Sequence, residues 1–267
     1  MEKKTDSVET VKSIASDLKA VEPIVSVKNL IVTGKDGRLL VDHLSLQLKR
    51  GETLGLVGES GSGKTLTLKS LIGLLPKNLS ESYEEKKING NVAMIFQNPM
   101  SALDPLCPVF AQLIEVVMIR QNVSKKEAVC RANELIERLG LPKELSKKDR
   151  LPSELSGGQC QRLVIARALL YDAAVYIFDE AASNIDVESE ELIMDVIHEL
   201  AKIKTVLLIS HRLANVVESD QIYFLKNGEI QEHGKHEELM QKDGEYRHLY
   251  ESQMALENYG RQVNRDV

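Results

Sequence analysis

Residues 51–75 read "GETLGLVGESGSGKTLTLKSLIGLL" and join three local patterns in one segment. It begins as a short apolar strand, passes through a glycine-rich loop and continues as a helix. Residues 58–65, "GESGSGKT", match the pattern G-x-x-x-x-G-K-[ST] in the strand–loop–helix context that this motif requires. The loop amides and the positive end of the following helix favour a bound phosphate. The stretch therefore predicts a nucleotide-binding α/β protein.

Each position of this loop has an expected role. The backbone amides of Gly61 to Thr65 are expected to surround a β-phosphate, and Lys64 to neutralise the β- and γ-phosphate oxygens. The Thr65 hydroxyl is expected to ligate Mg²⁺. The predicted phosphate-binding residues are Gly58, Glu59, Ser60, Gly61, Ser62, Gly63, Lys64 and Thr65.

A second apolar strand, "VYIFDE" at residues 175–180, ends in two acids. Following a phosphate loop in chain order, Asp179 is expected beside the Mg²⁺ ion. Glu180 stands one residue further on, where a carboxylate can polarise a water aimed at the γ-phosphate. Taken alone, such an acid pair is also compatible with a solvated strand end.

A second glycine-rich helix start lies at residues 153–162, "SELSGGQCQR". Ser156 can act as N-cap, Gly157 and Gly158 allow close backbone approach, and Gln159 stands at the capping-box position. This helix start is also suited to bind an anion. One nucleotide does not need two such helix starts within one chain, so the second one requires a separate explanation.

The rest of the chain indicates an α/β architecture. Strands alternate with helices from residue 157 to residue 210, which predicts a mainly parallel sheet. Two strands at residues 24–33 and 39–49 predict a small antiparallel β-subdomain, and residues 98–151 are mostly helical. The Asn-Gly pair at 227–228 predicts a hairpin between two late strands. The expected fold is a P-loop nucleotidase core with a small antiparallel β-subdomain and a helical insertion subdomain.

Composition excludes several classes of protein. The 267 residues are 43% hydrophobic and 28% charged, with a net charge of −6, so a nucleic-acid partner is not expected. No apolar run approaches the length of about 18 residues that spans a bilayer. Residues 1–22 are polar, with apolar positions at helical spacing, and do not read as a secretory signal. The three cysteines have no metal-ligand spacing and are expected to be reduced.

Five motifs in this order resemble the nucleotide-binding subunit of an ATP-binding cassette (ABC) transporter: "GESGSGKT", "IFQNP", "ELSGGQCQR", "IFDEAASNID" and "ISHR". The resemblance covers residues 24–257. It implies a head-to-tail dimer in which ATP lies between the phosphate loop of one subunit and the "LSGGQ" helix of the other. The Ser156–Gln159 helix start would then serve the partner's γ-phosphate.

The resemblance also assigns roles to residues outside these two loops. Gln97 would sense Mg²⁺ and the attacking water, and His211 would contact the γ-phosphate. Residues 183–186, ending at Asp186, would cross the dimer interface. The implied catalytic residues are Glu180, His211 and Gln97, and the implied metal contacts are Thr65, Gln97 and Asp179.

Three departures from the family pattern are visible. The adenine-stacking aromatic position falls on Gly34. The interval between Lys64 and Gln97 is short, so part of the usual antiparallel strand-and-loop region is expected to be missing. Cys160 stands just after the signature, where glutamine, arginine or methionine is common.

The resemblance implies a Mg²⁺-dependent ATPase bound to membrane permease subunits on the cytoplasmic face of the membrane. The working unit would be a homodimer or a heterodimer with a second ABC ATPase, in some systems with a solute-binding protein. The N-terminal half resembles ATPases for peptide or nickel import and the C-terminal half resembles exporter cassettes. Uptake of peptide-like or metal solutes is favoured, with export, a soluble non-transport ABC protein, or a nucleotide-dependent regulator without turnover as alternatives.

The expected domain organisation has three parts. A polar extension covers residues 1–22, and the ATPase domain covers residues 23–257, with its helical subdomain at about 98–160. A C-terminal tail covers residues 258–267.

Overall fold

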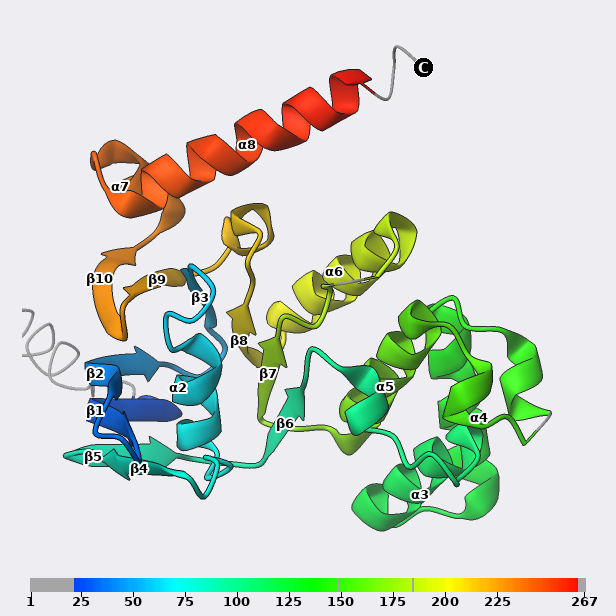
Figure 1. Ribbon diagram of the computed structural model, residues 1–267. Helices are drawn as coiled ribbons and strands as arrows, with labels where there is room; N and C mark the ends of the chain where they lie inside the picture. The colour runs from blue at the N-terminus through cyan, green and yellow to red at the C-terminus, as the bar shows by residue number, and fades with distance from the viewer. Residues whose placement is uncertain (1–21, 148, 184, 264–267) are drawn as a thin grey trace, which may run out of the picture.

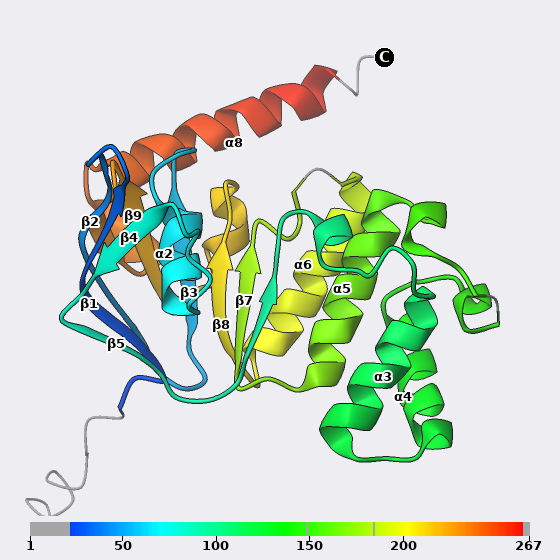
Figure 2. The same cartoon turned by 60° about the horizontal axis from the view of Figure 1, so that its bottom comes forward.

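A computed structural model describes residues 22–263 except 148 and 184, and the predicted amphipathic helix within 1–22 lies almost wholly outside the described residues. Two sheets and a separate group of helices make up this part of the chain (Figures 1 and 2). None of its helices is both long enough and apolar enough to cross a lipid bilayer.

The larger sheet has six strands in the order β10-β9-β3-β8-β7-β6. Its members are β3 (Thr53–Gly58), β6 (Val92–Ile95), β7 (Val175–Asp179), β8 (Thr205–Ile209), β9 (Gln221–Lys226) and β10 (Glu229–Gly234). All neighbours are parallel except β10, which pairs antiparallel with β9. The mainly parallel sheet predicted from the strand–helix alternation is therefore confirmed.

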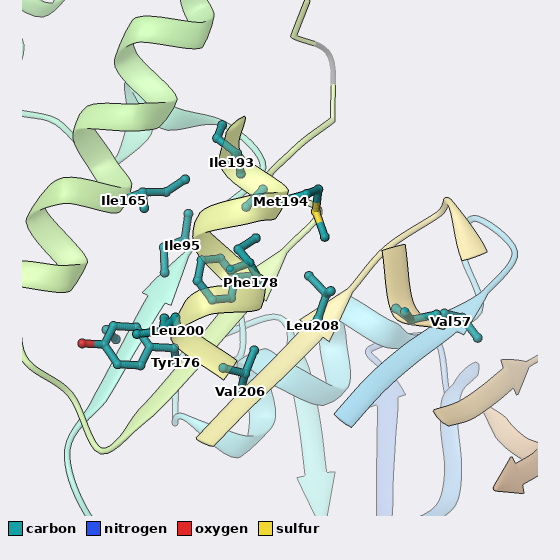
Figure 3. Close-up of a cluster of buried hydrophobic side chains, with 14 of the residues drawn as sticks. Val57, Ile95, Ile165, Tyr176, Phe178, Ile193, Met194, Leu200, Val206 and Leu208 are labelled. Carbon is teal, nitrogen blue, oxygen red and sulfur yellow. The ribbon is translucent and has the colours of Figure 1, made fainter. Parts of the chain in front are cut away.

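Alternate residues of β7 and β8 face two different hydrophobic clusters, because successive side chains of a strand point to opposite faces. Val175 and Ile177 pack with Leu68 and Leu71 of helix α2 (Lys64–Leu71). Tyr176 and Phe178 pack on the other face, against α5 (Gly157–Tyr171) and α6 (Val187–Ala201), as Figure 3 shows for this cluster. Helices α2 and α5 therefore lie on opposite faces of the sheet.

The smaller sheet is antiparallel and contains β1 (Val25–Gly34), β2 (Leu39–Leu48), β4 (Leu79–Ser82) and β5 (Glu85–Ile88). The two strands predicted at the start of the chain correspond to β1 and β2. Strands β4 and β5 lie in the interval for which a missing strand-and-loop region was expected, and both pair with β1. Their sequences "LSES" and "EKKI" lack a clear apolar alternation, and none of their residues is buried. Backbone pairing with β1 holds these two strands in place.

Helices α3 (Val109–Gln121) and α4 (Lys125–Arg138) pack against α5 around a third cluster that includes Leu113, Ala132 and Leu163. The short 3₁₀ turn η1 (Pro99–Ser101) precedes α3, and the turns η2 (Lys143–Ser146) and η3 (Pro152–Glu154) connect α4 to α5. Figure 2 shows α3 and α4 at the end of the molecule farthest from the antiparallel sheet. This arrangement separates α3 and α4 from α2.

The last part of the chain contains η4 (Leu213–Val216), the β9–β10 hairpin, α7 (His236–Gln241) and α8 (Glu245–Val263). The Asn-Gly hairpin is confirmed: Asn227 and Gly228 have φ values of 52° and 86°, as a two-residue primed turn requires. Helix α8 continues to Val263, into the segment 258–267 that was expected to be a C-terminal tail. Helix α2, in contrast, ends earlier than expected, because Gly73 adopts a left-handed φ of 72°.

Candidate active site

The predicted phosphate, metal and catalytic residues gather where parallel strands end. The phosphate loop follows β3, Gln97 follows β6, and Asp179 ends β7 with Glu180 directly after it. His211 follows β8, the strand between β3 and β7. The carboxyl ends of parallel strands share one edge of a sheet, which is where α/β proteins of this type bind ligands.

Glycine is required in the phosphate loop by conformation and by space. Gly58 has a φ of 142°, and a Cβ atom there would lie 2.1 Å from the backbone oxygen of Leu225. Gly61 and Gly63 have φ values of 80° and 102°, which side chains rarely tolerate. Gly63 is the N-cap of α2, so the loop delivers its amides directly to a helix N-terminus.

The Lys64 side chain is 6% exposed and lies along the phosphate loop. Its ammonium donates hydrogen bonds of 2.8 Å to the backbone oxygens of both Gly58 and Glu59. Burial lowers the pKa of this ammonium, while the charges of Glu180 and Asp179 act in the opposite direction. The loop thus holds a buried cation at the place predicted for phosphate binding.

The predicted metal ligands Thr65 and Asp179 are in contact, with 3.0 Å between the donating Thr65 hydroxyl and Asp179 Oδ1. Burial raises the pKa of the Asp179 carboxyl, and the Thr65 hydrogen bond opposes this shift. Within the described residues, no group of three or more His, Cys, Asp and Glu side chains could hold a metal. A hydroxyl and one carboxylate nevertheless fit Mg²⁺, which keeps waters and takes further ligands from substrate phosphates.

Of the three predicted catalytic residues, Gln97 and His211 both approach the carboxylate of the third, Glu180. Gln97 Nε2 donates to Glu180 Oε2 over 3.2 Å, and His211 Nδ1 lies 3.8 Å from the same oxygen. Glu180 has a φ of 51°, a left-handed conformation that is strained for a residue with a Cβ atom. Its backbone holds this conformation by donating to the Ile209 oxygen over 3.1 Å and accepting from the Ser183 hydroxyl over 2.8 Å.

The loop that carries His211 is held by neighbours that the sequence did not reveal. The Ser210 hydroxyl donates to the Arg212 backbone oxygen over 2.8 Å, and the Arg212 amide donates back to that hydroxyl over 3.0 Å. The Arg212 side chain forms a 2.6 Å ion pair with the buried Glu190 of α6. The Arg212–Glu190 pair joins residues 22 positions apart, and no local pattern signals it.

The second glycine-rich stretch starts a helix, as predicted. The Ser156 hydroxyl accepts from the Gln159 amide over 3.2 Å, and Gln159 Oε1 accepts from the Ser156 amide over 3.1 Å, which is a complete capping box. A Cβ atom on Gly157 would meet nothing within 4 Å, whereas one on Gly158 would lie 2.6 Å from Ser189 Oγ. Gly157 is thus open to its surroundings, while Gly158 packs against the start of α6.

Asp186, predicted to lie at a dimer interface, is the N-cap of α6 and accepts from the Ser189 amide over 2.8 Å. This hydrogen bond lowers the pKa of the Asp186 carboxyl. Cys160, one of the departures from the family pattern, is fully buried, and burial raises the pKa of its thiol. Cys160 therefore faces the core and not the exposed surface of the signature.

The structure does not bring the two glycine-rich helix starts together. Helices α2 and α5 pack on opposite faces of the six-stranded sheet and are well separated in both views (Figures 1 and 2). The segment around Gly34 forms a tight turn, in which the Gly34 amide donates to the Arg38 oxygen over 2.9 Å. This turn, "GKDGR", offers no aromatic ring for a base.

A parallel sheet, a phosphate loop after β3 and an acid pair after β7 together define a P-loop nucleotidase fold. A family model described as "ABC transporter" matches residues 41–183, which is more than half of the 267 residues. The chain therefore belongs to the ATP-binding cassette transporter family, as the order of its motifs indicated.

The known proteins that this chain resembles include both kinds that the two halves of the sequence suggested. An ATP-dependent lipid A-core flippase of Vibrio vulnificus is 35% identical over 243 residues, covering 86% of this chain and 41% of the relative. A candidate peptide import ATP-binding protein of Brucella abortus is 37% identical over 217 residues, covering 74% of this chain and 64% of the relative. The chain thus spans less than two thirds of the length of these relatives.

Among solved structures, a dimeric ATP-binding cassette in a post-hydrolysis state with ADP and Pi bound is similar. It is 26% identical with a TM-score of 0.68, and the match covers 79% of this chain and 98% of that one. The α/β cassette fold predicted from the sequence is thereby confirmed.

Proposed function

We propose that this chain is the ATP-binding and ATP-hydrolysing subunit of a membrane transporter. The observation that carries the proposal is the meeting of Gln97, Glu180 and His211 at one carboxylate. These three residues follow β6, β7 and β8, at the same edge of the sheet as the phosphate loop and the Thr65–Asp179 pair. A general base beside a phosphate-binding loop is the arrangement that activates water for attack on a γ-phosphate.

In this proposal each group of the site has one task. The amides of residues 61–65 and the Lys64 ammonium bind the phosphates of ATP. Thr65 and Asp179 would hold Mg²⁺, with Gln97 as a further contact, and the bound ion would neutralise charge on the phosphate oxygens. Glu180 accepts the proton of the attacking water, with Gln97 and His211 orienting water and γ-phosphate.

The signature helix serves a nucleotide held by another cassette. The Ser156–Gln159 helix start offers backbone amides to an anion, yet α5 and α2 lie on opposite sides of the sheet. Two cassettes packed head to tail would place the signature of each against the phosphate loop of the other. Binding of ATP then stabilises the closed pair and hydrolysis releases it. The second cassette is another copy of this chain or a related ATPase.

We further propose that the cassette spans residues 23–257, with a helical subdomain at about 98–160 that contacts permease subunits at the cytoplasmic face of a membrane. Uptake of peptide-like or metal solutes is the favoured transport function, in line with the Brucella relative. Export is a second candidate, because the match to the Vibrio flippase extends over more of the chain. In either case the transporter's other subunits select the solute.

Phosphate release from Mg-ATP by the purified chain, alone and with the membrane proteins that co-purify with it, tests this function. We expect turnover that EDTA abolishes, together with co-purification of an integral membrane protein. Binding of ATP without phosphate release under both conditions would instead identify a regulatory binder. Turnover without any membrane partner would favour the soluble non-transport class.

A further inference from the structure

One side chain of the C-terminal helix holds both ends of the His211 loop. Gln253 Nε2 donates to the His211 backbone oxygen over 2.7 Å, and Gln253 Oε1 accepts from the Leu213 amide over 2.8 Å. A carboxamide carries a donor and an acceptor together, so it can satisfy both backbone groups at once. A carboxylate could accept from Leu213 but could not donate to His211.

The helix α8 is anchored so that position 253 faces this loop. Tyr246, Leu249 and Tyr250 pack on the same hydrophobic cluster as Leu213, and Gln253 continues their face at a spacing of seven residues from Tyr246. Tyr246 is fully buried, and its hydroxyl lies 2.8 Å from His236 Nδ1. Helix α8 lies over the η4 region in both views (Figures 1 and 2).

At the start of α8, the Tyr246 amide donates to Glu232 Oε1 over 3.1 Å. The helix is therefore fixed to the β9–β10 hairpin at one end and to the His211 loop seven residues further along. Both hydrogen bonds of Gln253 end on backbone atoms of the loop. A shift of α8 would therefore move the loop.

The loop needs this support because the His211 side chain is exposed. Its relative exposure is 53%, and its contact with Glu180 is a 3.8 Å approach rather than a hydrogen bond. Side-chain packing therefore does not fix the direction of the imidazole, and the backbone at residues 211–213 must do so. Ser210 holds the loop from within, and the Arg212–Glu190 pair holds it from the side of α6. Gln253 holds it from the side of α8.

We propose that Gln253 is a positioning residue for His211, through which the placement of α8 controls ATP turnover. The inference rests on the proposed ATPase function and deepens it, because it adds a site of control that is remote from the nucleotide. A partner or segment that shifts α8 would change hydrolysis without touching the phosphate loop.

Steady-state phosphate release by Gln253→Ala and Gln253→Glu, in the complex that gives the highest wild-type turnover, tests the proposal. Misplacement of a reacting group by about 1 Å costs up to roughly a hundredfold in rate, so we expect kcat to fall by about tenfold or more with KM for ATP unchanged. Ser252→Ala, on the neighbouring position of α8, is the matched control and should keep wild-type kcat.

The double variant with His211→Ala separates positioning from general damage. If Gln253 acts through His211, Gln253→Ala should lower kcat in the wild-type background and have no further effect in the His211→Ala background. Equal losses in both backgrounds, or wild-type kcat in both Gln253 variants, would overturn the proposal. Gln253→Glu is nearly isosteric and keeps the Leu213 acceptor, so it guards against a folding defect in the alanine variant.

Amide hydrogen exchange tests the same contact without turnover. In Gln253→Ala the Leu213 amide should exchange about tenfold faster or more, while amides in the middle of β8 stay protected. Unchanged exchange at Leu213 would overturn the inference even in a chain that does not hydrolyse ATP. A wild-type chain without phosphate release, but with this exchange response, would contradict the proposed ATPase function and leave the contact between Gln253 and the His211 loop standing.

Discussion

Replacing Glu180 by glutamine is expected to abolish most ATP turnover while leaving ATP binding intact. The glutamine amide keeps the size of the side chain but cannot accept a proton from water, and loss of a general base costs about 10²- to 10⁴-fold in rate. The phosphate loop is untouched, so affinity for ATP should stay near the wild-type value. Because hydrolysis no longer releases the closed pair, the variant should accumulate as a nucleotide-bound dimer.

Phosphate release, equilibrium binding of ATP and size-exclusion chromatography with Mg-ATP measure the three effects of the Glu180 change. Glu229→Gln, the same substitution at an exposed position of β10, is the control and should behave as wild type. Wild-type turnover in Glu180→Gln would refute the assignment of Glu180 as the base. Loss of ATP binding together with turnover would show that Glu180 acts on the fold of the site instead.

The Lys64→Ala substitution is expected to weaken ATP binding strongly. The Lys64 ammonium is buried in the phosphate loop and donates to its carbonyl groups. It supplies the positive charge that the loop offers to a bound phosphate. Removing one partner of a buried, hydrogen-bonded charge pair costs about 2–5 kcal/mol, which corresponds to about thirtyfold to several thousandfold in affinity. Isothermal titration with ATP measures the loss.

Lys77→Ala removes an exposed lysine a short distance beyond α2 and serves as the control for the change in net charge. It should leave ATP affinity unchanged. An affinity of Lys64→Ala equal to that of wild type would exclude the expected role of Lys64 on the phosphates.

Local sequence patterns predicted the parts of the fold that depend on local contacts. The Ser156–Gln159 capping box and the Asn227–Gly228 hairpin each involve residues no more than a few positions apart. Strands β4 and β5 were missed, because their polar sequences are held by pairing with a strand about 45 to 63 residues earlier. Where partners are distant in the chain, periodicity carries little information about them.

In the candidate site, too, single residues could be predicted from local motifs, whereas contacts between distant residues could not. The motifs identified Gln97 and Glu180 individually, but their contact joins residues 83 positions apart and required the structure. Gln253 could have been suspected from the stripe of Tyr246, Leu249 and Tyr250, which it continues at helical spacing. Its target, the backbone around His211, could not be inferred. Nearly every residue carries the same backbone amide and carbonyl, so the sequence does not show which of them a side chain binds.

Mixing two inactive variants shows whether two cassettes complete each other's ATP sites. Lys64→Ala removes the phosphate loop's cation but keeps an intact signature. Gly157→Asp places a carboxylate on the signature, in space that is open within one chain, and an acid suits the start of a helix. Gly157→Asp should therefore fold, and each variant alone should hydrolyse ATP very slowly.

In a mixed dimer of these variants, one of the two sites combines the intact phosphate loop of one chain with the intact signature of the other. Random pairing in equal amounts makes half of the dimers mixed, so co-expression should restore roughly a quarter of wild-type phosphate release. A mixture as inactive as its components, or full turnover by Gly157→Asp alone, would contradict a site shared between two copies of this chain.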